Sequence, residues 1–304
     1  MKSAPVKNSP AKPARAKPAA HAKAVDAKIP AVHVDADNRI AKTFARLKAE
    51  GKKAFIAYIC AGDPHLDATV DLVVGLAGAG ADVIELGIPY SDPMADGPAN
   101  QAACERALRA GTTVAGIIAA VAKIRERTQV PLLFFTYCNP VLAFGLEKFA
   151  NAAHAAGVDG VLPLDLPPEE AGEFLEKMRA AGLANVCLSA PNTPPKRQRL
   201  LARASRGFLY YVCRMGVTGE RTELPKDLKT RVAALKKASP APVCIGFGIS
   251  TPEQAALAAG FGDGVIVGSH LVRMIEKHGQ DLDLVAMVAG RASMLADAVH
   301  AVKA

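Results

Sequence analysis

The chain has 304 residues, which is enough for one large α/β domain or for two smaller domains. Hydrophobic residues make up 50% of it and charged residues 22%, a balance that is typical of a globular enzyme and excludes a wholly disordered chain. The formal net charge is +8, but seven Lys or Arg against three Asp in residues 1–38 account for +4 of it, so the remaining residues are close to neutral and do not indicate a nucleic-acid-binding surface.

Residues 1–38 are rich in Ala, Pro and Lys and contain few large apolar side chains. Such a composition cannot offset the entropy lost on ordering, so we predict a disordered extension there and a single catalytic domain at 39–304. No apolar run is long enough to cross a bilayer, and the N-terminus lacks the apolar segment of a secretory signal, so we expect no membrane partner and a cytoplasmic location. The six cysteines form no C-x-x-C pair, and we expect reduced, mostly buried thiols.

From about residue 40 onward, short runs of β-branched and apolar residues alternate with helical segments. Alternation of this kind favours a parallel sheet with helical crossovers, and eight units close a (β/α)₈ TIM barrel. The eight predicted strands are Ala54–Cys60, Val83–Gly87, Pro131–Tyr137, Gly160–Asp165, Asn185–Ser189, Phe208–Val212, Val243–Phe247 and Gly264–Val267.

Helical periodicity between and around these runs supports the same architecture. The segment after the first strand places apolar residues on one helical face, at Val70, Val73, Val74 and Ala77. A helix that precedes the first strand could cover the bottom of the barrel with Ile40, Phe44 and Leu47, and an apolar closing helix is predicted at Leu284–Val302.

A weak internal repeat marks three of the joints between helix and strand. Glycine followed by aspartate stands just before an apolar run at Asp82, Asp159 and Asp263. Glycine can end a helix with a positive φ, and a short polar residue turns the chain into the next strand.

The second predicted strand carries a carboxylate that we expect to face the barrel interior. Side chains alternate along a strand, so Glu85 shares a face with Val83 while Ile84 and Leu86 pack outward against helices. A buried carboxyl group has a raised pKa, as a general acid at neutral pH requires, although a structural glutamate is the alternative. The following loop is rich in Pro, Gly and Asp, and supplies Asp96 as a second carboxylate at the end of the barrel where active sites lie.

Glycines after the last two strands predict a phosphate site, because backbone amides at these loops commonly bind phosphate in barrels. The residues concerned are Gly246, Phe247, Gly248, Gly268 and Ser269, and Gly219, after the sixth strand, resembles a third contributor in the family described below. Residues 214–222 indicate a mobile lid that includes Arg214, Gly216 and Thr218. The seven histidines show no pair at metal-ligand spacing, so no metal site is expected.

The run Ile84–Gly97 resembles, without a break, the signature of the tryptophan synthase alpha family. The resemblance continues in order over roughly residues 40–280, through segments that begin at Gly62, Thr136, Arg214, Gly246 and Gly268. It implies a lyase of tryptophan biosynthesis that splits indole-3-glycerol phosphate by a retro-aldol reaction into indole and glyceraldehyde 3-phosphate.

The resemblance also assigns roles to particular residues. Glu85 corresponds to the principal acid/base, and Asp96 to the carboxylate that binds the indole nitrogen. Tyr210 matches a tyrosine beside the reacting glycerol, which could hydrogen-bond Glu85 or be a core residue, and Thr218 matches a threonine that meets the loop aspartate when the lid closes. Tyr58 and Tyr90 stand where phenylalanine is common in the family.

The family implies a partner, the beta subunit, in an αββα complex in which the beta subunit holds pyridoxal phosphate and the alpha chain holds no cofactor. The resemblance places the interface at loops around Asp92–Met94, Asn139 and Pro140. Two other functions stay open on sequence alone: a phosphate-binding barrel isomerase or epimerase, and a catalytically silent barrel that regulates a partner. The first does not need the run from Glu85 to Asp96, and the intact carboxylates argue against the second.

Overall fold

The computed structural model describes residues 37–213, 224–246 and 248–303. Almost all of the predicted extension at 1–38 lies outside these ranges, so that boundary stays a prediction. The described strands are all paired in parallel and belong to one sheet. They are β1 Ala54–Cys60, β2 Val83–Gly87, β3 Leu132–Thr136, β4 Gly160–Pro163, β5 Ala184–Asn185, β6 Cys187–Ser189, β7 Leu209–Val212, β8 Val243–Gly246 and β9 Gly264–Val267.

The order of the strands shows how the sheet forms a barrel. It runs β5-β4-β3-β2-β1-β9-β8-β7-β6, and its two end strands are consecutive in the sequence, separated only by Val186. The Val186 amide continues the pairing with β4 by donating to the Val161 carbonyl at 3.0 Å. β5 and β6 are therefore two halves of one barrel strand, and the prediction of an eight-unit (β/α)₈ barrel is confirmed.

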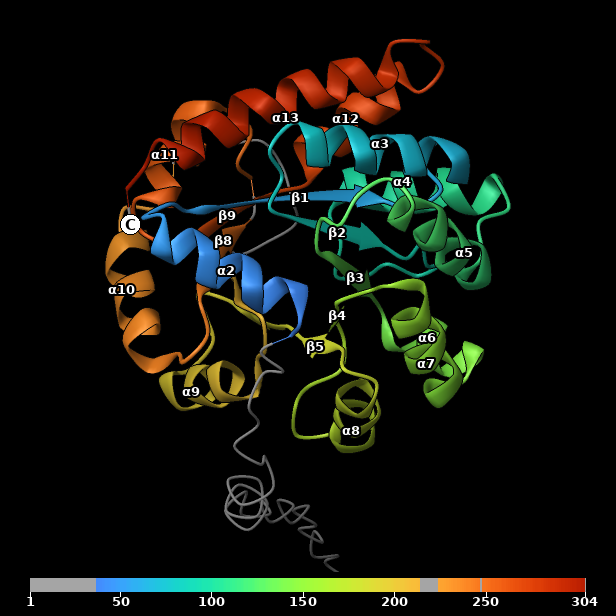
Figure 1. Cartoon of the computed structure of the whole chain (residues 1–304). Helices are drawn as coiled ribbons and strands as arrows, with labels where there is room; N and C mark the ends of the chain where they lie inside the picture. Colours follow the sequence, from blue (N-terminus) through green and yellow to red (C-terminus); the bar gives the residue numbers. More distant parts are fainter. Residues whose placement is uncertain (1–36, 214–223, 247, 304) are drawn as a thin grey trace, which may run out of the picture. The chain divides into compact units, whose positions relative to one another are not determined.

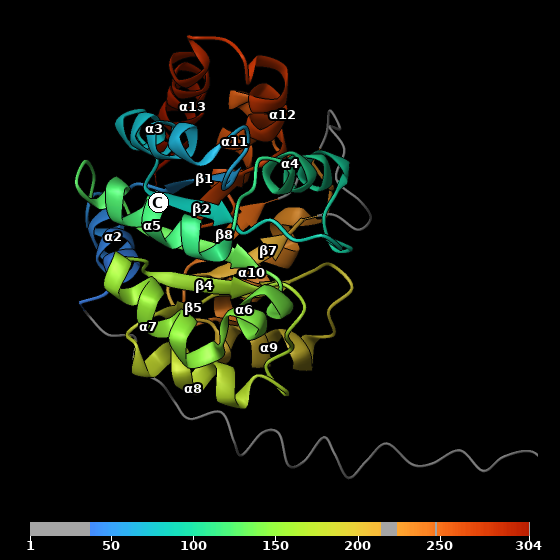
Figure 2. The same cartoon turned by 90° about the vertical axis from the view of Figure 1, so that its right-hand side faces the viewer.

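Helices lie outside the strands and connect them (Figures 1 and 2). Two helices instead of one follow β2, β3 and β9. The described helices are α2 Arg39–Ala49, α3 Leu66–Gly78, α4 Pro98–Arg109, α5 Val114–Arg125, α6 Cys138–Phe144, α7 Leu146–Ala156, α8 Gly172–Ala180, α9 Pro195–Ala204, α10 Leu228–Ala238, α11 Pro252–Ala259, α12 Ser269–His278 and α13 Leu284–His300.

Side chains from alternate positions of the strands fill the barrel interior. One apolar cluster joins residues of the strands and their ends, among them Ile56, Val83 and Leu133, to the buried face of α2. Ile40, Phe44 and Leu47 of that helix belong to the same cluster, as expected for a helix that closes the N-terminal end of the barrel. The predicted closing helix is also present, as α13.

The predicted apolar face of α3 is only partly correct. Val70 and Val73 are buried, but Val74 and Ala77 are half-buried, and Leu72 and Leu76 are fully covered instead. The reason is that α3 packs against α5 and α13 as well as against the sheet. Contacts on both sides widen the buried face beyond a single stripe.

The Gly-Asp repeat has a structural explanation at the N-terminal ends of the strands. Each of the three aspartates accepts a hydrogen bond from the backbone amide at the start of a neighbouring strand: Asp82 from Phe55, Asp159 from Leu132 and Asp263 from Val243, at 2.8–2.9 Å. Each aspartate amide also donates to the carbonyl of that same residue at 2.7–2.9 Å. The repeat therefore fixes the register between neighbouring parallel strands.

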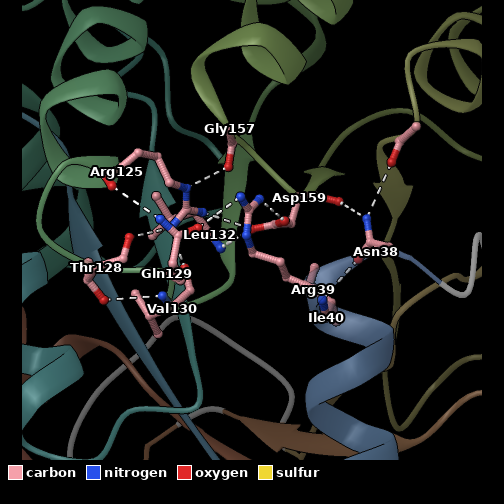
Figure 3. Close-up of polar contacts among 11 residues, drawn as sticks. Asn38, Arg39, Ile40, Arg125, Thr128, Gln129, Val130, Leu132, Gly157 and Asp159 are labelled. Atoms are coloured by element: carbon pink, nitrogen blue, oxygen red, sulfur yellow. Dashed lines mark hydrogen bonds and ion pairs between the residues drawn. The ribbon is translucent and has the colours of Figure 1, made fainter.

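Basic side chains pair with all three carboxylates, of which Asp82 and Asp159 are buried, and the pairing is most complete at Asp159. Arg39 and Arg125 each place a guanidinium nitrogen 2.9 Å from it, and Asn38 donates to its backbone carbonyl at 2.7 Å. Figure 3 shows the two arginines converging on Asp159, with Arg39 coming from the start of α2. This cluster attaches α2 to the barrel.

Candidate active site

Glu85 lies in the middle of β2 and its side chain is 1% exposed. Val83, two residues earlier, belongs to the interior cluster, and the alternation of a strand directs Glu85 to the same side. Among the residues that the structure describes, neither carboxyl oxygen of Glu85 has a hydrogen-bond partner. Burial raises the pKa of this carboxyl group to about 8. Glu85 is therefore protonated at neutral pH and can act as a proton donor.

Asp96 stands two residues before α4, in the loop that follows β2, and is 7% exposed. Its carboxylate accepts a hydrogen bond from the Tyr137 hydroxyl at 2.8 Å and from the Asn100 side-chain amide at 3.2 Å. Burial raises the pKa of Asp96, and these two donors oppose that rise by stabilising the ionised form. The two carboxyl groups thus have different surroundings: one has no partner, and the other is held by two donors.

Sequence reasoning did not find Tyr137 and Asn100 as partners of Asp96. Asn100 follows Asp96 by four residues, a spacing that could have indicated a contact at the start of a helix. Tyr137 comes from the end of β3, and its hydroxyl also accepts a hydrogen bond from the Ala95 amide at 2.9 Å. One tyrosine thereby fixes both the backbone and the carboxylate of the loop.

Tyr210 of β7 is buried in the interior cluster and makes no hydrogen bond to Glu85, so of the two expectations for this residue the structure agrees with the core tyrosine. The Tyr210 hydroxyl instead lies against β8: a Cβ added to Gly246 would come within 2.3 Å of its oxygen. Burial, and then the neighbouring charge of Glu85, raise the pKa of Tyr210. Tyr210 is therefore near Glu85 and stays protonated.

Tyr58 of β1 is a second buried tyrosine in this part of the barrel. It is in register with Glu85 across the β1–β2 pair, and its ring meets Phe135 edge-on at 5.1 Å between centroids. A Cβ on Gly87 would lie 2.4 Å from its hydroxyl oxygen, and a Cβ on Gly268 would lie 3.1 Å from its ring. Both glycines thus make room for the tyrosine, which reaches from the carboxyl end of β2 to the start of α12.

The predicted phosphate-binding glycines lie at the carboxyl ends of β8 and β9. Gly248 has a φ of +80°, a conformation that favours glycine, and Gly268 is the N-cap of α12. Ser269 begins that helix, whose first turn has no acidic residue. Backbone amides at such a helix start are suited to an anion. Phe247, Gly219 and the lid residues Arg214, Gly216 and Thr218 lie outside the described residues.

A partly buried ion pair supports the loop between β1 and α3. Asp63 is 1% exposed and accepts hydrogen bonds from Arg106 of α4, from Nε at 2.9 Å and from Nη2 at 2.8 Å. This bidentate pair joins the end of β1 to the helix that follows Asp96. The pair thereby orients the loop that contains Asp63.

Within ranges 37–213, 224–246 and 248–303, no three His, Cys, Asp or Glu side chains are grouped so that they could hold a metal ion. In the same ranges no single helix is long and apolar enough to span a membrane. The bent pair α4 and α5 meets that criterion only when the two helices are taken together, with 95° between them.

Comparisons with known proteins agree on one family. Residues 44–299 match the family model described as tryptophan synthase alpha chain. The tryptophan synthase alpha chain of Geobacter sulfurreducens is 51% identical over 240 residues, covering 79% of this chain and 91% of that protein. The corresponding chain of Caulobacter sp. is 46% identical over 268 residues, covering 88% of this chain and 98% of that protein.

Solved structures give the same result. The crystal structure of tryptophan synthase subunit alpha from Legionella pneumophila superposes with a TM-score of 0.80 at 38% identity, covering 87% of this chain and 99% of that one. A structure of Mycobacterium tuberculosis tryptophan synthase superposes with a TM-score of 0.79 at 36% identity, covering 86% of this chain and 98% of that one. The chain belongs to the tryptophan synthase alpha chain family.

Proposed function

We propose that Glu85 and Asp96 carry out the lyase reaction of this family, the cleavage of indole-3-glycerol phosphate to indole and glyceraldehyde 3-phosphate in tryptophan biosynthesis. The observation that supports this most is the state of Glu85: a fully buried carboxyl group without a hydrogen-bond partner among the described residues, and with a pKa of about 8. Such a group retains a transferable proton at neutral pH and has no structural task.

The bond to be broken joins C3 of the indole ring to the carbon that bears the first hydroxyl group of the glycerol chain. Proton transfer from Glu85 to C3 converts the ring to an indolenine cation. The carbon–carbon bond can then break, with its electron pair returning to the ring, while the hydroxyl oxygen loses its proton and becomes the aldehyde oxygen. The Glu85 carboxylate left by the first step is the base for this second proton, so no net proton is exchanged.

Asp96 suits the charge that develops in this reaction. The Tyr137 and Asn100 hydrogen bonds favour its ionised form and fix its direction. A carboxylate beside the indole N–H is attracted more strongly to the cationic intermediate than to the neutral substrate, and such differential binding lowers the barrier. We expect Tyr210, which remains protonated beside Glu85, to contact the glycerol part of the substrate.

For the substrate phosphate we propose the amides after β8 and β9. Gly246 and Gly248 are buried, and Gly268 and Ser269 are partly exposed at the start of α12. An anion there faces backbone N–H groups and the positive end of a helix. Phe247 and Gly219 are expected to complete the site, with Arg214, Gly216 and Thr218 in a lid over it.

The alpha chains of this family work with a beta subunit, which carries the pyridoxal phosphate. We propose an αββα complex, located in the cytoplasm, for this chain. Two exposed apolar side chains support a partner surface on the expected loops: Met94 is 84% exposed and Leu142 is 57% exposed. Asn139 donates a hydrogen bond to the Tyr90 hydroxyl at 3.3 Å and so joins the two loops.

The test is indole release from indole-3-glycerol phosphate by the wild-type chain, Glu85→Gln and Asp96→Asn, each with and without a beta subunit. We expect release by the wild type, an increase with the partner, and a loss of about a hundredfold to ten-thousandfold for Glu85→Gln in both conditions. A matched control, Glu147→Gln on the exposed face of α7, should keep full activity. If the wild type releases no indole even with the partner, a regulatory barrel or another sugar-phosphate enzyme becomes the better interpretation.

A further inference from the structure

Two cysteine thiols outside the proposed reaction lie together between β1 and α4. Cys60 is the last residue of β1 and is fully buried, and Cys104 is on the buried face of α4 with 4% exposure. They belong to one small cluster that also contains Tyr58, Ala103 and Ala107. The two thiols are close enough for each to shift the pKa of the other. Neither Cys60 nor Cys104 is in a disulfide, so this pair is in the dithiol state.

A second link keeps these two elements together. Arg106, two residues after Cys104, forms the bidentate ion pair with Asp63, three residues after Cys60. The end of β1 and the middle of α4 are thus joined at two successive points along both segments. This double attachment keeps the thiols adjacent, as a disulfide requires.

The two thiols differ in their surroundings. Contact with the Cys60 thiol and with the Tyr90 backbone amide lowers the pKa of Cys104. The pKa of Cys60 is raised by the same thiol contact and by burial. Because the thiolate is the reactive form, Cys104 is the better nucleophile. Cys60 stays protonated until it attacks the oxidised Cys104.

We propose that Cys60 and Cys104 are an oxidation site, in which hydrogen peroxide produces a reversible disulfide that lowers indole release. The Cys104 thiolate attacks one peroxide oxygen and becomes a sulfenic acid, and the other oxygen leaves as water after taking a proton. The Cys60 sulfur then attacks the Cys104 sulfur, its own proton and the hydroxyl group leaving as a second water. Two thiols and one peroxide thereby give one disulfide and two waters.

The expected effect on activity follows from the contact between α4 and Asp96. A disulfide brings the two sulfurs to about 2.05 Å, closer than a hydrogen bond between thiols, so α4 must move toward β1. Asn100, one turn before Cys104, holds Asp96, and the Tyr90 amide that contacts Cys104 lies in the same loop. Since a displacement of about 1 Å can cost about a hundredfold in rate, we expect at least a tenfold loss of kcat/KM. Of the two measurements below, only the loss of indole release rests on the proposed function; the detection of the disulfide does not.

The experiment treats the full chain with hydrogen peroxide and follows both the covalent link and indole release. Cys60 and Cys104 fall in one tryptic peptide, residues 54–106, which would lose two hydrogens on oxidation. Further cleavage at Glu85 then separates the two cysteines unless a disulfide joins them. Cys104→Ser removes the pair, and Cys138→Ser, at the least buried of the six cysteines, is the matched control.

The expected result is a link in the wild type and in Cys138→Ser, absent in Cys104→Ser, with a parallel loss of activity that a reducing dithiol restores. The proposal is overturned if no disulfide forms at any peroxide concentration at which the chain stays folded. It is also overturned if peroxide lowers the activity of Cys104→Ser as much as that of the wild type. If the reduced wild type releases no indole, the proposed function fails, but the mass of peptide 54–106 still decides whether the disulfide forms.

Discussion

Replacing Glu85 by glutamine should change how the stability of the protein depends on pH. The carboxyl group has a pKa of about 8 when folded and 4.5 as the reference for the unfolded chain, because burial disfavours the charge. Below pH 4.5 both states are protonated. Between pH 4.5 and 8 the unfolded chain ionises while the folded one does not, so the folded wild type loses stability as pH rises. Glutamine does not ionise and removes this dependence.

The size of the effect follows from the width of that pH window. Each pH unit between the two pKa values changes the free energy of unfolding by about 1.4 kcal/mol. The difference between Glu85→Gln and wild type should therefore grow by about 3 kcal/mol from pH 4.5 to 7 and by about 4 kcal/mol by pH 8, and it should level off above that pH.

Urea unfolding of both proteins at closely spaced pH values between 5 and 9 measures this difference. Glu147→Gln serves as the control, because Glu147 is exposed and Lys177 lowers its pKa rather than raising it. The free energy of unfolding of Glu147→Gln should not rise relative to that of the wild type as pH rises. A difference for Glu85→Gln that is constant from pH 5 to 8 would refute the reasoning, since it would mean that Glu85 is already ionised and paired in the folded protein.

Three further predictions concern the surroundings of the site and the opposite end of the barrel. Tyr137→Phe removes a hydrogen bond to the Asp96 carboxylate, worth about 1.5–3 kcal/mol, and should lower kcat/KM for indole release by about tenfold or more while the fold, measured by circular dichroism, is unchanged. Gly246→Ala places a methyl group 2.3 Å from the position of a tyrosine hydroxyl and should raise KM in steady-state assays, whereas unchanged kinetics would contradict the close packing. Asp159→Asn leaves the Arg125 charge without its buried partner and should destabilise the protein by about 3 kcal/mol in urea unfolding, with KM unaffected because the change lies far from the substrate.

The strands could be predicted from the sequence because each is a short apolar run between polar turns. Predicted and observed boundaries agree within about two residues, including the strand that the structure divides at Val186. The direction of Glu85 followed from alternation within one strand, which needs no knowledge of its neighbours. The face of α3 was predicted less well, because its burial depends on α5 and α13, which come much later in the chain.

The partners of the site residues could be predicted only where they are local. Asn100 lies one helical turn from Asp96, but Tyr137 is 41 residues away, and no periodicity links a loop aspartate to a tyrosine at the end of another strand. The contact between Cys60 and Cys104 is of the same kind, since it depends on how α4 returns to β1. Such contacts are set by the closure of the barrel and not by any local pattern.

Carboxyl groups near the N-terminal end of the barrel stabilise the fold, whereas Glu85, nearer the carboxyl end, is suited to chemistry. At the N-terminal end Asp82, Asp159 and Asp263, the first two of them buried, each accept a hydrogen bond from a backbone amide and pair with a basic side chain, so they fix the strand register. Glu85, further along its strand toward the carboxyl end, has no partner among the described residues and lowers stability at neutral pH. An unpaired carboxyl group of this kind persists only where the rest of the fold supplies the missing stability, and its lack of a partner leaves its proton available to a substrate.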